Sequence, residues 1–120
     1  MPRPKKIALD ALCHECGATF QTTRGARFCC PVHQVAFGNR MAARGKVFAP
    51  YVMAWISGKG GGHRGSHPVV GKCLSEITAI VREFIDEDKA AGRPPSTAYA
   101  EALFAEGFLY CDRKRTKRRP

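Results

Sequence analysis

The sequence predicts an α+β protein that is mostly α-helical, with a small β-hairpin and helix followed by a helical C-terminal half. Three observations support this fold class. Candidate metal ligands cluster within residues 13–33, on either side of a polar turn. Apolar residues recur at helical spacing from residue 70 onwards. Both ends of the chain carry runs of Lys and Arg, which predicts disordered basic termini.

Length and composition limit the class of protein. At 120 residues the chain has room for one compact domain with arms, which excludes a large multidomain enzyme. Hydrophobic residues make up 44% and charged residues 25%, so wholesale disorder is excluded. The longest apolar stretch, residues 47–56, is too short to span a membrane, and no apolar signal core follows the basic N-terminus. We therefore expect a cytoplasmic protein without a membrane partner.

The charge is unevenly distributed along the chain. Lys and Arg number 20 against 10 Asp and Glu, a formal net charge of +10. Residues 1–65 hold ten basic and two acidic residues, residues 66–112 hold four and eight, and residues 113–120 add six basic residues. Such positive charge attracts polyanions, so nucleic acid is the expected partner, DNA before RNA. An anionic membrane surface is the weaker alternative.

Candidate ligands for one metal ion open the first half of the chain. Residues 1–12 are expected to be a basic N-terminal arm, and residues 13–56 a zinc-binding module with a packing helix. Cys13 and Cys16 are separated by two residues, so one tight turn places both sulfurs on the same ion. The remaining ligands are Cys29 or Cys30, together with His33. Either cysteine is compatible with the spacing, so the third ligand stays open at this point.

Between the two ligand pairs we expect a short hairpin. The twelve residues that separate Cys16 from Cys29 are enough to carry Phe20 and Phe28 on its arms. Pro31 suits the first position of the helix that follows. A redox dithiol would need a βαβ context, and a zinc deaminase would need a different order of His, Glu, Pro and Cys. Because four protein ligands leave no position for water, we expect one structural Zn²⁺ and no enzyme activity.

The pattern of Cys, Phe and His residues in this segment resembles that of a known family of zinc-binding modules. The order C-x2-C-G, then Arg-x-Phe-Cys, then a ligand and Phe37, resembles the FCS-type zinc fingers, which include the TRASH and MYM-type modules. This resemblance implies a treble-clef-like fold in which Cys29 is the ligand and Cys30 caps the helix. His33 stands where that family usually has cysteine. The segment around Asn39 and Arg40 is similar to uncharacterised bacterial and prophage small zinc-finger proteins.

The helix from Pro31 is expected to end near Lys46, and a second short helix is expected to start at Pro50 and pack on the module. The first helix has an apolar side and a basic outer face. Its basic face is a candidate nucleic-acid contact, with help from the hairpin. The candidate contacts of this module are Arg24, Arg27, Asn39, Arg40, Arg44 and Lys46.

The C-terminal half is expected to consist of a Gly-rich basic linker over residues 57–69 and a helical hairpin over residues 70–110. In the hairpin, Cys73 is expected in the core, Gly92 to stop the first helix, Ser96 to cap the second and Gly107 to end it. The acidic outer face of these helices points to a protein partner rather than to DNA.

The basic tail, residues 111–120, completes the expected organisation. Its cations are expected to bind phosphates with little sequence discrimination. The whole pattern predicts a zinc-stabilised nucleic-acid-binding protein, a DNA-binding regulator or accessory factor of phage or bacterial origin. The competing class is a protein-interaction adaptor or inhibitor with a purely structural zinc. The tail contacts are Arg113, Lys114, Arg115, Lys117, Arg118 and Arg119.

Overall fold

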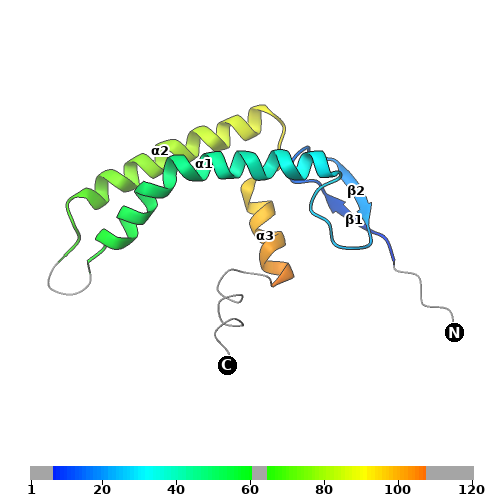
Figure 1. Cartoon of the computed structure of the whole chain (residues 1–120), viewed down its shortest axis with the longest axis horizontal. Helices are drawn as coiled ribbons and strands as arrows, with labels where there is room; N and C mark the ends of the chain where they lie inside the picture. Colours follow the sequence, from blue (N-terminus) through cyan, green and yellow to red (C-terminus); the bar gives the residue numbers. More distant parts are fainter. Residues whose placement is uncertain (1–6, 61–64, 108–120) are drawn as a thin grey trace, which may run out of the picture.

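The computed structural model describes residues 7–60 and 65–107. It contains a two-stranded sheet and three helices, which confirms the expected α+β, mostly α class (Figure 1). The expected basic tail and most of the N-terminal arm lie outside the described residues. The elements in chain order are β1 (Leu9–Leu12), β2 (Thr19–Thr22), α1 (Pro31–Gly58), α2 (Val69–Ala90) and α3 (Ser96–Glu106).

The hairpin lies earlier in the chain than the sequence suggested. Strands β1 and β2 pair antiparallel, with Leu9 opposite Thr22 and Leu12 opposite Thr19. The C-x-x-C segment is therefore the turn of the hairpin, and β1 occupies part of the expected N-terminal arm. The strand ends at Thr22 because its hydroxyl accepts hydrogen bonds from the backbone N–H groups of Arg24 and Ala26, both at 3.2 Å.

Helix α1 is continuous from Pro31 to Gly58, so the expected break before Pro50 and the separate second helix are wrong. Pro50 removes one backbone donor, which normally kinks or breaks a helix. Figure 1 shows that α1 bends in the half that contains Pro50 but goes on beside α2. Packing against α2 on both sides of the proline therefore outweighs its local preference.

The helical hairpin is formed by α1 and α2, which run antiparallel along one another, and not by residues 70–110 (Figure 1). After α2 the chain turns at Gly92, which has φ 73°, and Pro94 and Pro95 send α3 away from α2. The N-cap of α3 is Pro95 and not the expected Ser96. Gly107 ends α3 in the left-handed conformation, as predicted.

Two regions result, which we call the head and the arm. The head comprises β1, β2, residues 13–30, the first turns of α1 as far as Phe37, and α3. An aromatic cluster joins its parts: the Phe37 ring lies 5.1 Å from Phe28 and 4.7 Å from Tyr99, and the His14 ring lies 5.3 Å from Tyr99. These contacts explain why α3 packs on the head.

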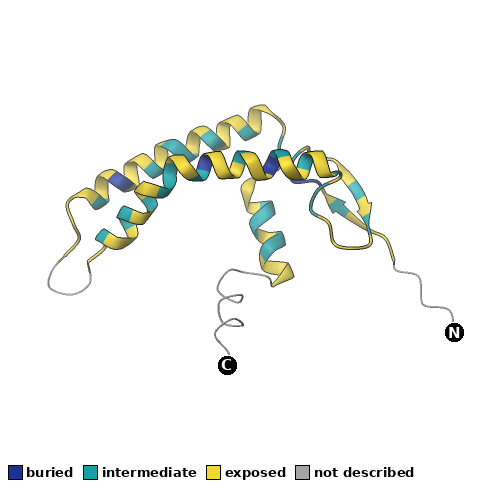
Figure 2. Cartoon of the chain, viewed as in Figure 1, coloured by how far each residue is buried: buried dark blue, intermediate teal, exposed yellow. Residues whose placement is uncertain are grey.

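The arm comprises α1 from Arg44 onwards together with α2. Its only buried apolar side chain is Cys73, which confirms the prediction that this cysteine lies in the core. Figure 2 shows that most of the arm is exposed or half-buried. Among the described helices, none combines the length and the apolar character needed to cross a membrane.

Candidate metal centre

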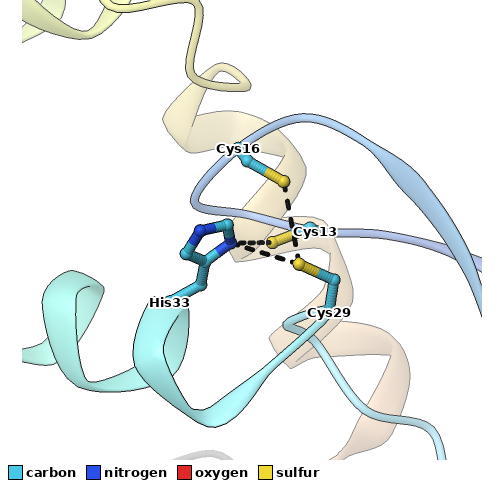
Figure 3. A group of neighbouring side chains, drawn as sticks. All are labelled: Cys13, Cys16, Cys29 and His33. Atoms are coloured by element: carbon cyan, nitrogen blue, oxygen red, sulfur yellow. Dashed lines mark hydrogen bonds between the residues drawn. The ribbon is translucent and has the colours of Figure 1, made fainter.

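The structure brings Cys13, Cys16, Cys29 and His33 together at the junction of the hairpin and α1 (Figure 3). Their ligand atoms all lie within 4.8 Å of one another. The Cys16 and Cys29 sulfurs are 3.8 Å apart, and the His33 Nδ1 lies 3.1 Å from the Cys29 sulfur and 3.7 Å from the Cys13 sulfur. The donor set is therefore three sulfurs and one imidazole nitrogen that point to one centre.

These separations can be compared with those around a tetrahedral ion. Sulfur bonds of about 2.3 Å and a nitrogen bond of about 2.0 Å place two sulfurs about 3.8 Å apart and a sulfur about 3.5 Å from the nitrogen. The sulfur pair and the two sulfur–nitrogen pairs fall close to these values. The group is therefore arranged to hold one metal ion with small side-chain adjustments.

The first ligand pair is positioned by the turn of the hairpin. The Cys13 N–H donates to the Ala18 carbonyl and the Gly17 N–H donates to the Cys13 carbonyl, both at 2.9 Å. Gly17 has φ 80°, and a Cβ atom there would lie 3.3 Å from the Gly92 carbonyl oxygen. Glycine at this position therefore serves both the turn and the close approach of the segment before α3.

The second ligand pair is positioned by the start of α1. Cys30 is the N-cap in an extended conformation and Pro31 is in the first turn, so His33 faces back towards Cys29. Cys29 joins the group and Cys30 does not, in agreement with the family resemblance. The Cys30 sulfur lies 3.9 Å from the Cys29 sulfur and makes no side-chain capping bond to α1.

The thiols of Cys13 and Cys29 differ in pKa. Burial raises the pKa of the Cys13 thiol, but hydrogen bonds from the backbone N–H groups of Cys16, Cys29 and Glu15 outweigh it and lower the pKa to about 6. Desolvation and hydrogen bonds with the Cys13 and Cys16 sulfurs raise the pKa of the Cys29 thiol to about 12. Crowded thiols lose all their protons only when a cation balances the charge, so the site favours a metal ion.

The arginines predicted to contact nucleic acid are mostly paired inside the molecule. Arg40 forms a two-pronged ion pair with Glu15, in which its Nη1 donates at 2.9 Å. Arg44 is buried and donates to Asp88 at 2.8 and 2.9 Å. The prediction that Arg40 and Arg44 form an outward basic face is therefore wrong. They instead neutralise carboxylates that would otherwise be desolvated.

Arg27 is also paired, with Glu106 of α3 at 2.7 Å. The sequence indicated none of these partners, because each is distant along the chain. Arg24, Asn39 and Lys46 are exposed, as expected of contact residues. The six predicted tail contacts lie outside the described residues.

His14 is a further residue that the sequence did not single out. It is buried within the C-x-x-C segment, and its Nδ1 has no hydrogen-bond partner among the described residues. Burial lowers the pKa of His14, and the nearby Arg27 charge lowers it further. His14 lies in the aromatic cluster and outside the group of candidate ligands.

No protein-family model, no curated protein and no solved structure matches this chain. The geometry of the described residues therefore carries the functional interpretation. That geometry consists of a group of candidate metal ligands in the head, the arginine–carboxylate pairs of Arg27, Arg40, Arg44 and Arg93, and an exposed two-helix arm.

Proposed function

We propose that the head holds one structural Zn²⁺ through Cys13, Cys16, Cys29 and His33, in a module of the FCS type. Three sulfurs and one imidazole form a donor set typical of structural zinc, and their separations match those around a tetrahedral ion. Four protein ligands fill the coordination sphere, so the ion links the hairpin to α1 and has no open position for substrate.

The protein as a whole is proposed to bind nucleic acid, with duplex DNA as the first ligand to test. The observation that carries this proposal is the partition of charge. The described residues hold ten Lys and Arg against nine Asp and Glu, whereas the chain as a whole has a net charge of +10. Nearly all the excess positive charge therefore belongs to residues 1–6, 61–64 and 108–120, outside the nearly neutral head and arm.

This partition revises which residues carry the binding. Because Arg27, Arg40 and Arg44 are each paired with carboxylates, they contribute little net attraction for phosphates. The tail, residues 113–119, has six cations and no acidic residue. Contacts of this kind act through the displacement of counterions and discriminate little between sequences. Among the predicted contacts of the body, Arg24 and Lys46 are the exposed cations.

The test is fluorescence anisotropy with a labelled DNA duplex across a salt series, using the zinc-loaded full-length chain. A variant in which the six tail cations are replaced by Gln separates charge from chain length. Each phosphate contact contributes about −0.9 to the slope of log K against log salt, so the variant is expected to lose about five units of slope. Binding that is unchanged by the substitutions would contradict the assignment to the tail.

A matched control tests the revised role of the body. Lys46→Gln and Arg24→Gln together remove two exposed cations and are expected to change the slope by less than about two units. RNA of the same length is compared under the same conditions to test the preference for DNA. Absence of binding to either nucleic acid at low salt would remove the proposed function and leave the zinc assignment standing.

The second candidate is a protein-interaction adaptor, and the exposed apolar side chains of the arm favour it. Met53 and Ile56 on α1 are 71% and 57% exposed. An apolar contact with a protein keeps its affinity as salt rises, whereas phosphate contacts weaken. Salt dependence therefore discriminates between the two functions.

A further inference from the structure

The arm has the pattern of an antiparallel coiled coil with one complete seam. On each helix one set of mostly buried or half-buried positions recurs at spacings of three and four, which is the heptad spacing of a two-helix seam. Arg44 of α1 contacts Phe84 and Asp88 of α2, which fixes the side on which the helices meet. The seam positions, of which Tyr51 and Glu87 are exposed and the others buried or half-buried, are Arg44, Phe48, Tyr51, Trp55 and Gly58 of α1 and Val70, Cys73, Ile77, Ile80, Phe84 and Glu87 of α2.

The two flanks of this seam differ in chemistry. In an antiparallel pair, the residues that directly follow the seam on both helices lie on the same side of the pair. Between Lys59 at the end of α1 and Asp88 near the end of α2, one such side carries no charged residue, and we call this stretch the uncharged face. The opposite side includes Glu76, Glu83 and Asp86 of α2. The uncharged face consists of Gly45, Ala49, Val52 and Ile56 of α1 and of Leu74, Thr78, Val81 and Ile85 of α2.

Large apolar side chains on this face are open to solvent. Ile56 is 57% exposed, Leu74 is 46% exposed and Ile85 is 39% exposed, so no described segment covers them. The seam alone buries little, because Cys73 is its only buried apolar side chain. A two-helix layer stabilises itself poorly without a second layer to cover its apolar side.

We propose that the uncharged face packs against the same face of a second copy of the chain, so that two arms form a four-helix bundle. Helices of a bundle carry apolar residues at the two seam positions and at one flanking position, whereas a lone coiled coil needs only the seam. Both α1 and α2 follow the bundle pattern, and on the same side. This inference goes beyond the proposed function and is independent of it.

Self-association fits the face better than a foreign partner. Between Lys59 and Asp88 the face has no charge that would select a complementary partner, and a twofold axis brings like surfaces together without repulsion. Gly45 and Ala49 leave room for the helix backbones to approach closely. The overlap of two such faces, each about 20 Å long and two helices wide, buries on the order of 1,000 Å², which is near the lower limit for specific association.

The test is the molar mass of the zinc-loaded full-length chain in solution. Sedimentation velocity from about 1 μM to about 200 μM is expected to show a monomer–dimer equilibrium with a Kd in the micromolar range. The measurement is made without nucleic acid and at high salt, which weakens phosphate contacts but not apolar packing. Failure to dimerise and failure to bind nucleic acid are therefore separate results.

Single substitutions locate the interface. Leu74→Glu and Ile56→Glu each place a carboxylate on the uncharged face and are expected to raise the Kd of the dimer about tenfold or more. Met53→Glu is the matched control, because Met53 is 71% exposed on the outer side of α1, and it is expected to change the Kd less than about twofold. Far-UV circular dichroism verifies that each variant keeps its helix content.

The outcomes are distinct. A concentration-dependent dimer that Leu74→Glu and Ile56→Glu weaken and Met53→Glu does not would support the proposal. A monomer at every concentration, or equal effects of all three substitutions, would overturn it. A variant that loses helix content is replaced by Leu74→Ala or Ile56→Ala, which shortens the same side chain without burying a charge.

Discussion

In the head, four candidate ligand side chains, three linked aromatic rings and ion pairs connect segments that are far apart in the sequence. In the arm, two long helices meet along a single seam that buries one apolar side chain. The head therefore gains its order from a few strong, localised links, and the arm from many weak, repeated contacts. Removing one link should collapse much of the head, whereas the arm should respond gradually to substitutions.

The largest expected effect is the loss of a metal ligand. Cys13→Ser should abolish stoichiometric zinc binding and unfold the head, because a structural zinc stabilises small modules by about 10 kcal/mol or more. The measurements are zinc content by atomic emission and the near-ultraviolet circular dichroism of the aromatic cluster. Cys30→Ser is the control and should keep one zinc, because the Cys30 sulfur stands outside the group. Equal zinc content in both variants would argue against the ligand set.

The next effect concerns the junction of head and arm. Arg44→Ala should lower the free energy of unfolding by about 3 kcal/mol, because the substitution removes a buried guanidinium with its two hydrogen bonds and leaves the partly buried Asp88 with Arg93 alone. Lys46→Ala changes a cation two residues away that is exposed, and should cost less than about 0.5 kcal/mol. Urea unfolding followed by circular dichroism measures both. Similar losses in the two variants would mean that the buried pair is not the stabilising contact.

A smaller effect is expected at Gly17. Gly17→Ala should destabilise the head by about 1–2 kcal/mol, because alanine must adopt a positive φ and its Cβ would crowd the Gly92 carbonyl oxygen. Gly25→Ala is the matched control, because Gly25 also has a positive φ but has open space around it. The difference in thermal midpoint between the two variants isolates the crowding from the backbone strain. No difference would indicate that the segment before α3 moves away freely.

The smallest effect is the dependence of the arm on acid pH. Hydrogen bonds from Arg44 lower the pKa of Asp88, burial opposes them, and Arg93 lowers the pKa further. The unfolded chain therefore takes up this proton first, so the stability that Asp88 contributes is complete above about pH 4 and is lost as pH falls through the lowered pKa. Asp88→Asn should be less stable at pH 6 and show a weaker acid dependence of the urea midpoint. Asp86→Asn, which changes an exposed carboxylate, should follow the wild type.

Short-range patterns were sufficient to predict several features. The fold class, the buried position of Cys73 and the end of α3 at Gly107 depend on spacings within a few turns of chain. The same is true of the four candidate ligands, which lie within residues 13–33 and meet in the structure. The helical spacing of apolar residues and the spacing of the Cys and His residues both depend on local chain geometry, so both can be read from a short stretch of sequence.

Features set by distant contacts were not predictable in this way. The partner of Arg44 lies 44 residues away and that of Arg27 lies 79 residues away, so both cations resembled free surface charges. Pro50 indicated a helix end because its local preference is strong, and only packing against α2 reverses it. The hairpin was misplaced because the C-x-x-C turn itself supplies the connection between the strands.

Helix α1 has His33 in its first turn and the far end of the arm in its last turn. Its 28 residues correspond to about 42 Å along the helix axis. The distance from the candidate metal ligands to the start of the Gly-rich segment is therefore set by one continuous helix and not by a flexible linker. In a pair of chains joined through their arms, the two α1 helices would hold the two candidate metal centres at one fixed spacing. The distance between the two heads of the pair would then be determined by the length of α1 and by its bend.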